Sequence, residues 1–117
     1  MRATVYQDDQ WDQLAVTIRE RYAGANRSEP LILIGHSFAA DDVLRVSREL
    51  EQSGIPVDLV VTIDPVIPPK VPSNVRRCYN LYQSNGAWDK VPMFRGIPLN
   101  PSPDSNVQLE NIDFRRK

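Results

Sequence analysis

This chain of 117 residues is short of cysteine and histidine, with one of each. Cys78 has no partner for an internal disulfide, which is typical of proteins from a reducing compartment, so we expect a cytoplasmic location. His36, the single histidine, leaves few ways to build a catalytic base within the sequence. Nothing in the sequence suggests a metal or a nucleotide, and we expect no cofactor.

An excess of charge and long hydrophobic runs are also lacking. The 14 lysines and arginines nearly balance the 15 aspartates and glutamates, so no basic field attracts phosphates and nucleic acid is not an expected partner. Arg76-Arg77 and Arg115-Arg116-Lys117 are too short to indicate a binding footprint. No stretch approaches membrane-spanning length, and the opening residues have neither the basic nor the apolar region of an export signal.

The hydrophobic pattern that is present predicts strands alternating with helices. Helical spacing runs from Trp11 to Tyr22, and again through Val43 to Leu50 until Ser53-Gly54. Apolar or β-branched runs predict strands at Ala3–Tyr6, Leu31–Ile34, Val57–Ile63, Val75–Tyr82 and Val107–Phe114. We therefore expect an α/β fold forming one domain over residues 1–117, a three-layer αβα sandwich with a mostly parallel sheet and helices on both faces.

The segment Gly35-His36-Ser37-Phe38-Ala39 lies between a predicted strand and a predicted helix. In that context a G-x-S-x-A sequence predicts a nucleophile elbow, a sharp turn that raises the serine hydroxyl above the sheet. The strained turn needs small neighbours, which Gly35 and Ala39 provide. At the start of the helix, the Phe38 backbone N–H can stabilise an oxyanion.

Two structural alternatives apply to this segment. Ser37 could simply cap the following helix, because serine is a favoured N-cap residue. His36 directly precedes the candidate nucleophile, so its side chain points away across the turn, and we expect a supporting role rather than catalysis.

The segment Ile34–Ala40, followed by Thr62-Ile63-Asp64-Pro65-Val66, resembles a bacterial lipase or esterase-like α/β-hydrolase. The resemblance implies a partial α/β-hydrolase fold, a serine hydrolase acting on a carboxylic ester or thioester, and Asp64 as the acid of the triad. Asp64 ends a buried strand beside the elbow strand, which would bring it to the same edge of the sheet. The alternative is an ordinary turn residue before Pro65.

The resemblance departs from the family at two places. The family order is serine, acid, histidine, and no histidine follows Asp64. The family's first strands and second oxyanion donor would precede Ala3, so the sequence is expected to be truncated at both ends, with a histidine base coming from outside it. The alternative is an inactive remnant of the hydrolase fold acting as a binding or oligomerisation module. Exposed sheet edges would favour a homo-oligomer.

Other conspicuous side chains have structural explanations. Asp41 and Asp42 fall in the first helical turn, where carboxylates interact favourably with the helix dipole. Aromatic and large apolar residues could line an acyl pocket but are more typical of a core; they are Tyr79, Tyr82, Trp88, Met93 and Phe94.

Overall fold

The computed structural model describes residues 10–22, 30–83, 98–103 and 105–113. The predicted alternation of helices and strands is present in them. The elements are α1 (Trp11–Tyr22), β1 (Ile32–His36), α2 (Phe38–Gln52), β2 (Val57–Ile63), β3 (Val75–Tyr82) and β4 (Gln108–Asp113). The strand expected at Ala3–Tyr6 lies outside the described residues, as do Trp88, Met93 and Phe94.

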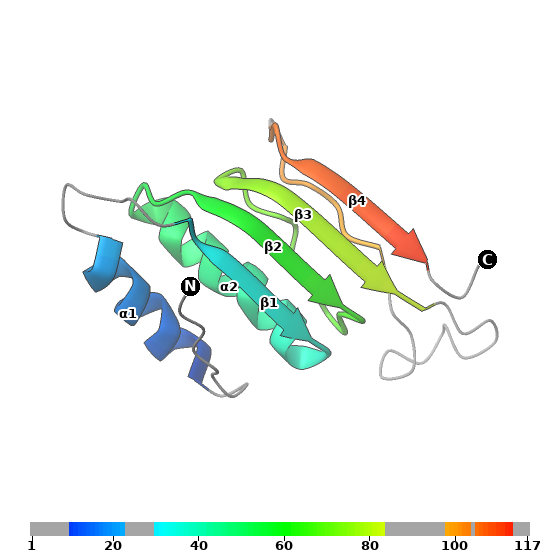
Figure 1. Ribbon diagram of the computed structural model, residues 1–117, viewed down its shortest axis with the longest axis horizontal. Coiled ribbons are helices and arrows are strands. Elements are labelled where there is room, and N and C mark those ends of the chain that lie inside the picture. Colours follow the sequence, from blue (N-terminus) through cyan, green and yellow to red (C-terminus); the bar gives the residue numbers. More distant parts are fainter. Residues whose placement is uncertain (1–9, 23–29, 84–97, 104, 114–117) are drawn as a thin grey trace.

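The strands form one four-stranded sheet in the order β1-β2-β3-β4, and every neighbouring pair is parallel. Figure 1 shows the four arrows side by side and pointing the same way. The α/β class with a parallel sheet is therefore confirmed. Because the strands are parallel, all their carboxyl ends lie at one edge of the sheet. Because β1 and β2 are neighbours, the turn after β1 lies next to the turn after β2.

Helix α2 lies against one face of this sheet, behind β1 and β2 in Figure 1, and α1 lies beside β1 and packs against α2. A connection between parallel strands is right-handed, so a chain that always advances in the same direction places every crossover on the same side. The loop between β2 and β3 follows this rule: the Asn74 amide donates to the Ser47 and Ile55 carbonyls at the α2 side. The described residues therefore form two layers, and the third layer of the expected sandwich stays a prediction.

The core fills the space between α2, α1 and the covered face of the sheet. Helix α2 is amphipathic, and its apolar stripe is fully buried because it points at β1 and β2. The side chains that form this core include Ala15, Leu33, Leu44, Val46, Leu50, Val60, Val71 and Cys78. Neither of the two described helices has the length and hydrophobicity needed to cross a membrane.

Candidate functional site

Ser37 links β1 to α2 in a backbone conformation that side chains disfavour. Its φ is 61° and its ψ is −125°. Among the described residues, only Asp64 shares a positive φ without being glycine, with a φ of 51°. Such conformations cost on the order of 1–3 kcal/mol each, and they persist where the surrounding structure fixes them. The strand, sharp turn and helix expected at Ser37 are all present.

Gly35 makes this turn sterically possible. A Cβ atom added at Gly35 would lie 2.2 Å from the Ala39 carbonyl oxygen and 2.8 Å from the Ala40 nitrogen. The start of α2 thus folds directly back over the end of β1. No side chain larger than hydrogen fits at residue 35 unless the backbone of the first helical turn moves.

Backbone hydrogen bonds hold the turn in place, and the Ser37 side chain does not cap the helix. The Ser37 N–H donates to the Ile63 carbonyl at 2.8 Å, and the Ala40 N–H donates to the Ser37 carbonyl at 3.0 Å. The Ser37 hydroxyl makes no capping hydrogen bond, which argues against the N-cap interpretation. The Phe38 N–H belongs to the first helical turn, where amides have no partner within the helix.

Asp64 lies directly after β2, at the same edge of the sheet as Ser37. Its N–H donates to the Leu81 carbonyl at 2.8 Å, so the ends of β1, β2 and β3 are joined by consecutive backbone bonds. One oxygen of the Asp64 carboxylate accepts the Gln83 N–H at 2.9 Å. The structure therefore brings Ser37 and Asp64 to neighbouring strand ends, and it also gives Asp64 a role in joining β2 to β3.

His36 lies on the open face of the sheet, away from the helices. It is exposed, and it pairs in the strand register with Ile63. Its place in β1 makes it a neighbour of Ser37 in sequence but puts its side chain on the face opposite α2. The arrangement agrees with the expectation that His36 does not act as the base for Ser37.

Asp41 has a function in the structure that the sequence interpretation missed. It is 1 % exposed, and its two carboxylate oxygens accept the backbone N–H groups of Val66 and Ile67 at 3.0 and 2.9 Å. These amides follow Asp64 in the loop after β2. Asp41 therefore joins the first turn of the elbow helix to the loop that carries Asp64, and an interaction with the helix dipole alone does not account for its burial.

A row of polar side chains crosses the sheet near the strand ends, with Thr62 and Asn80 buried and Asn111 exposed. Thr62, Asn80 and Asn111 are aligned in the register of β2, β3 and β4. The Thr62 hydroxyl donates to the Asn80 side chain at 2.8 Å, and the Asn80 amide donates to the Asn111 carbonyl oxygen at 3.0 Å. The Asn111 side chain then bonds both the N–H and the carbonyl of Leu99. The row anchors the segment 98–103. In the sequence only Thr62 interrupts an apolar run, so the row as a whole carries no clear sequence signal.

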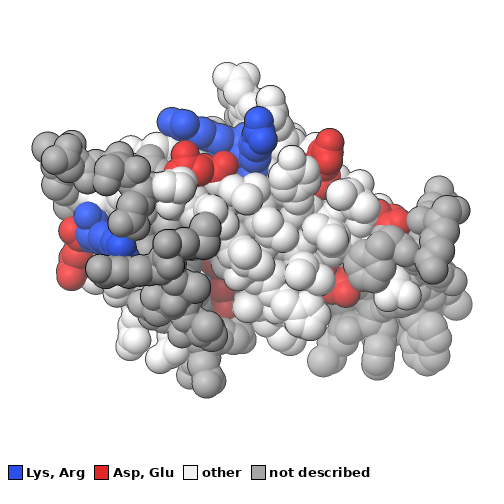
Figure 2. Space-filling view, viewed as in Figure 1, with Lys and Arg blue, Asp and Glu red and all other residues white. Residues whose placement is uncertain are grey.

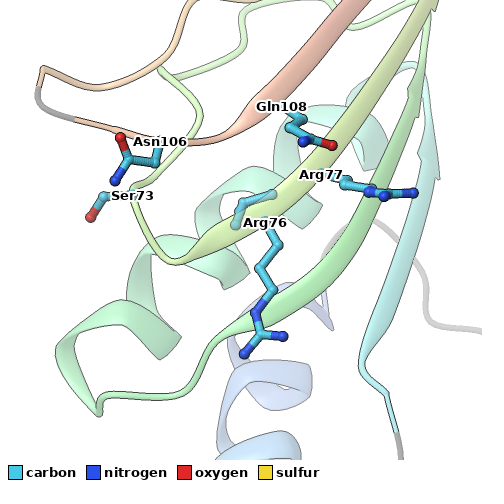
Figure 3. A pocket seen from close by; sticks show the side chains of 6 residues that line it. Ser73, Arg76, Arg77, Asn106 and Gln108 are labelled. Carbon is cyan, nitrogen blue, oxygen red and sulfur yellow. The ribbon is translucent and has the colours of Figure 1, made fainter.

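A shallow hollow of about 280 Å³ lies near the opposite, amino end of the sheet, between β3 and β4. Its polar lining includes Arg76, Arg77 and Gln108, which are shown in Figure 3. The two arginines do not converge: Arg77 lies beside Gln108, whereas Arg76 points away from both and lies 3.6 Å from the Asp58 carboxylate. This hollow is remote from Ser37 and offers no converging charge to a ligand.

The described residues thus define an α/β domain with a four-stranded parallel sheet and a strained serine turn at its carboxyl edge. They contain no cluster of histidine, cysteine and acidic side chains able to hold a metal ion. Comparisons with protein-family models, with curated proteins and with solved structures find no match.

Proposed function

We propose that this domain is of the serine hydrolase type and acts on a carboxylic ester or thioester. Ser37 is the nucleophile, Asp64 the acid that would orient a histidine, and the Phe38 N–H a donor to the oxyanion. The base is a histidine that this 117-residue sequence does not supply at the site. The wider resemblance to the α/β-hydrolase fold belongs to the same proposal.

The backbone at Ser37 is the observation that supports this proposal. A serine that only ended a strand or capped a helix would adopt ordinary φ and ψ values, and its hydroxyl would bond a first-turn amide. Ser37 instead has a φ of 61° with no capping bond. Strain retained beside helix N–H groups is typical of a residue whose side chain must be presented to a reactant.

The missing base sets the expected activity. Removing a triad member typically lowers turnover by about 10⁴ to 10⁶, and the remaining rate comes from the oxyanion donors and from substrate binding. The chain alone should therefore hydrolyse activated esters about 10⁴ to 10⁶ times more slowly than an enzyme with a complete triad. Added imidazole should raise that rate in proportion to its concentration, since it replaces the absent base in solution.

A fluorophosphonate probe tests the assignment of Ser37 directly. We expect slow but measurable labelling of the unaltered protein, and none above background for Ser37→Ala. Ser53→Ala is the control, because Ser53 lies exposed at the other end of α2 and should leave labelling unchanged. Mass spectrometry of the labelled peptide locates the adduct, and equal labelling of Ser37→Ala would contradict the proposal.

Substitution at the turn tests the geometry without removing the nucleophile. Gly35→Ala should abolish labelling, because the added methyl group collides with the backbone of the first turn of α2. Gly54→Ala is the matched control: Gly54 also has a backbone requirement, with a φ of 70°, but no atom lies within 4 Å of an added Cβ. Retained labelling in Gly35→Ala would show that the turn is not needed for reactivity.

A binding module without turnover is the second candidate, and one contact favours it. The Asp64 carboxylate already accepts the Gln83 N–H, a role that needs no catalysis. If this candidate is correct, Ser37 will not react with the probe even in the presence of imidazole. Labelling that increases with imidazole would instead favour the hydrolase.

A further inference from the structure

The face of the sheet opposite the helices is apolar and uncovered among the described residues. The strand register places three rows of side chains on it: Ile32, Leu59, Arg77 and Gln108; Ile34, Val61, Tyr79 and Glu110; His36, Ile63, Leu81 and Ile112. Ile34, at the edge of this face, is 65 % exposed, and Ile112 at the other edge is 42 % exposed. Parallel sheets are normally covered on both faces, so this surface calls for a partner.

The distribution of charge on this open face limits what the partner can be. Figure 2, which has the same view as Figure 1, shows a broad uncharged centre with charged side chains around its rim. Basic groups lie at the upper edge, near the start of β3, with acidic groups beside them, and further acidic groups lie along the right-hand side. A partner for this face therefore needs an apolar centre together with charges of both signs at its margin.

A second copy of the open face has both of these features. Arg77 and Glu110 are exposed, lie on adjacent strands one row apart, and form no ion pair within the described part of the chain. A two-fold axis that lies in the plane of the interface and passes between them brings Arg77 of one copy to Glu110 of the other, twice. Symmetric dimers are built from such self-complementary patches.

We propose that a second copy of this chain covers the open face, with apolar rows packed against apolar rows and Arg77 paired with Glu110 of the other copy. This interface involves the face of the sheet, whereas the sequence interpretation expected its edges to mediate assembly. The proposal is independent of the hydrolase chemistry, because it depends on no reaction at Ser37.

The size of the face sets the expected strength of the dimer. Four strands about 4.8 Å apart, with three rows of side chains about 6.6 Å apart, give a projected area on the order of 400 Å². Specific interfaces bury about 800 Å² of accessible surface per partner, so this interface is at the low end. We therefore expect a dimer that dissociates on dilution through the micromolar range.

Sedimentation velocity over a concentration series tests the apolar part of the interface. Ile34→Asp should weaken association at least tenfold. Ile67→Asp is the matched control, because Ile67 is also 65 % exposed but lies in the loop after β2, off the open face. A protein that stays monomeric at every concentration, or a dimer that Ile34→Asp leaves intact, would overturn the proposal.

Charge reversal tests the pairing across the interface. Arg77→Glu and Glu110→Arg should each be monomeric, since each places like charges together at both contacts. An equimolar mixture of the two variants should form a heterodimer, because both contacts then join opposite charges. Pairing within one chain could not produce this recovery. Circular dichroism verifies that each variant is folded, and a mixture of folded variants that remains monomeric would overturn the assigned contacts.

Discussion

The two faces of the sheet differ more than their sequences suggest. On the covered face, the polar side chains of Thr62 and Asn80 are fully buried. On the open face, the apolar side chain of Ile34 in the neighbouring strand β1 is 65 % exposed. From hydrophobicity alone, Ile34 would be expected to be buried, and Thr62 and Asn80 to be exposed. Position relative to the crossovers decides burial here, and buried polar groups are tolerated because they hydrogen-bond along a continuous row.

The largest expected effect comes from removing apolar volume on the covered side of the sheet. Leu44→Ala should lower the free energy of unfolding by about 3 kcal/mol, because Leu44 is fully buried under the covered face and leaves a cavity. Ile34→Ala should cost no more than about 0.5 kcal/mol when measured on the dissociated protein. Urea denaturation at low protein concentration measures both, and equal losses would mean that the open face is also packed.

The order of elements and much of their extent could be predicted from the sequence. The strands Val57–Ile63 and Val75–Tyr82 occur with the predicted bounds, and the helical spacing from Trp11 to Tyr22 corresponds to α1. These segments are bounded by turn residues, so local chemistry determines where they stop. The first described strand is Ile32–His36 rather than Leu31–Ile34, because pairing with β2 carries it into the turn.

Coverage of the sheet could not be predicted in the same way. The run Leu31–Ile34 is apolar on both sides, a pattern that favours cover on both faces of the sheet. An apolar side chain indicates a preference for burial but does not specify which element provides it. The order of the strands in the sheet decides which element covers each face, and this order is known only once the pairing of the strands is known.

The candidate site was predictable where its signal is local. The tight turn at Ser37 requires small neighbours, and the sequence shows them as Gly35 and Ala39. The connection made by Asp41 was not predictable, because its partners Val66 and Ile67 are backbone amides 25 and 26 residues away. Backbone amides carry no sequence signal, so a buried carboxylate that binds them resembles any acidic residue in a first helical turn.

Substitution of Asp41 should have an intermediate effect on the free energy of unfolding, and it allows a buried contact to be compared with an exposed one. Asp41→Asn should lower the free energy of unfolding by about 2 kcal/mol, because the N–H of either Val66 or Ile67 loses its acceptor. Glu51→Gln is the control: Glu51 also joins α2 to the loop before β3, through the N–H and hydroxyl of Ser73, but this contact is exposed. Its loss should be within about 0.5 kcal/mol.

The same pair of variants can separate fold from site. If Asp41 positions the loop that carries Asp64, Asp41→Asn should slow the labelling of Ser37 at temperatures where the variant is still folded. Glu51→Gln should leave the labelling rate unchanged. Equal labelling rates for the two variants would restrict Asp41 to a role in stability.

The pH dependence of stability that comes from Cys78 is the smallest expected effect, and it tests whether water reaches the covered face. Burial raises the pKa of its thiol from 9.0 to about 12. The unfolded thiol ionises above pH 9 while the native thiol stays protonated, so stability is fully retained below pH 9 and falls as the pH rises toward 12. Relative to pH 8, about 1 kcal/mol should be lost at pH 10. Cys78→Ala should lack this component, and the difference between the two pH profiles of urea denaturation isolates it from other titrating groups. Identical slopes would mean that water reaches Cys78 and that the covered face resembles the open one.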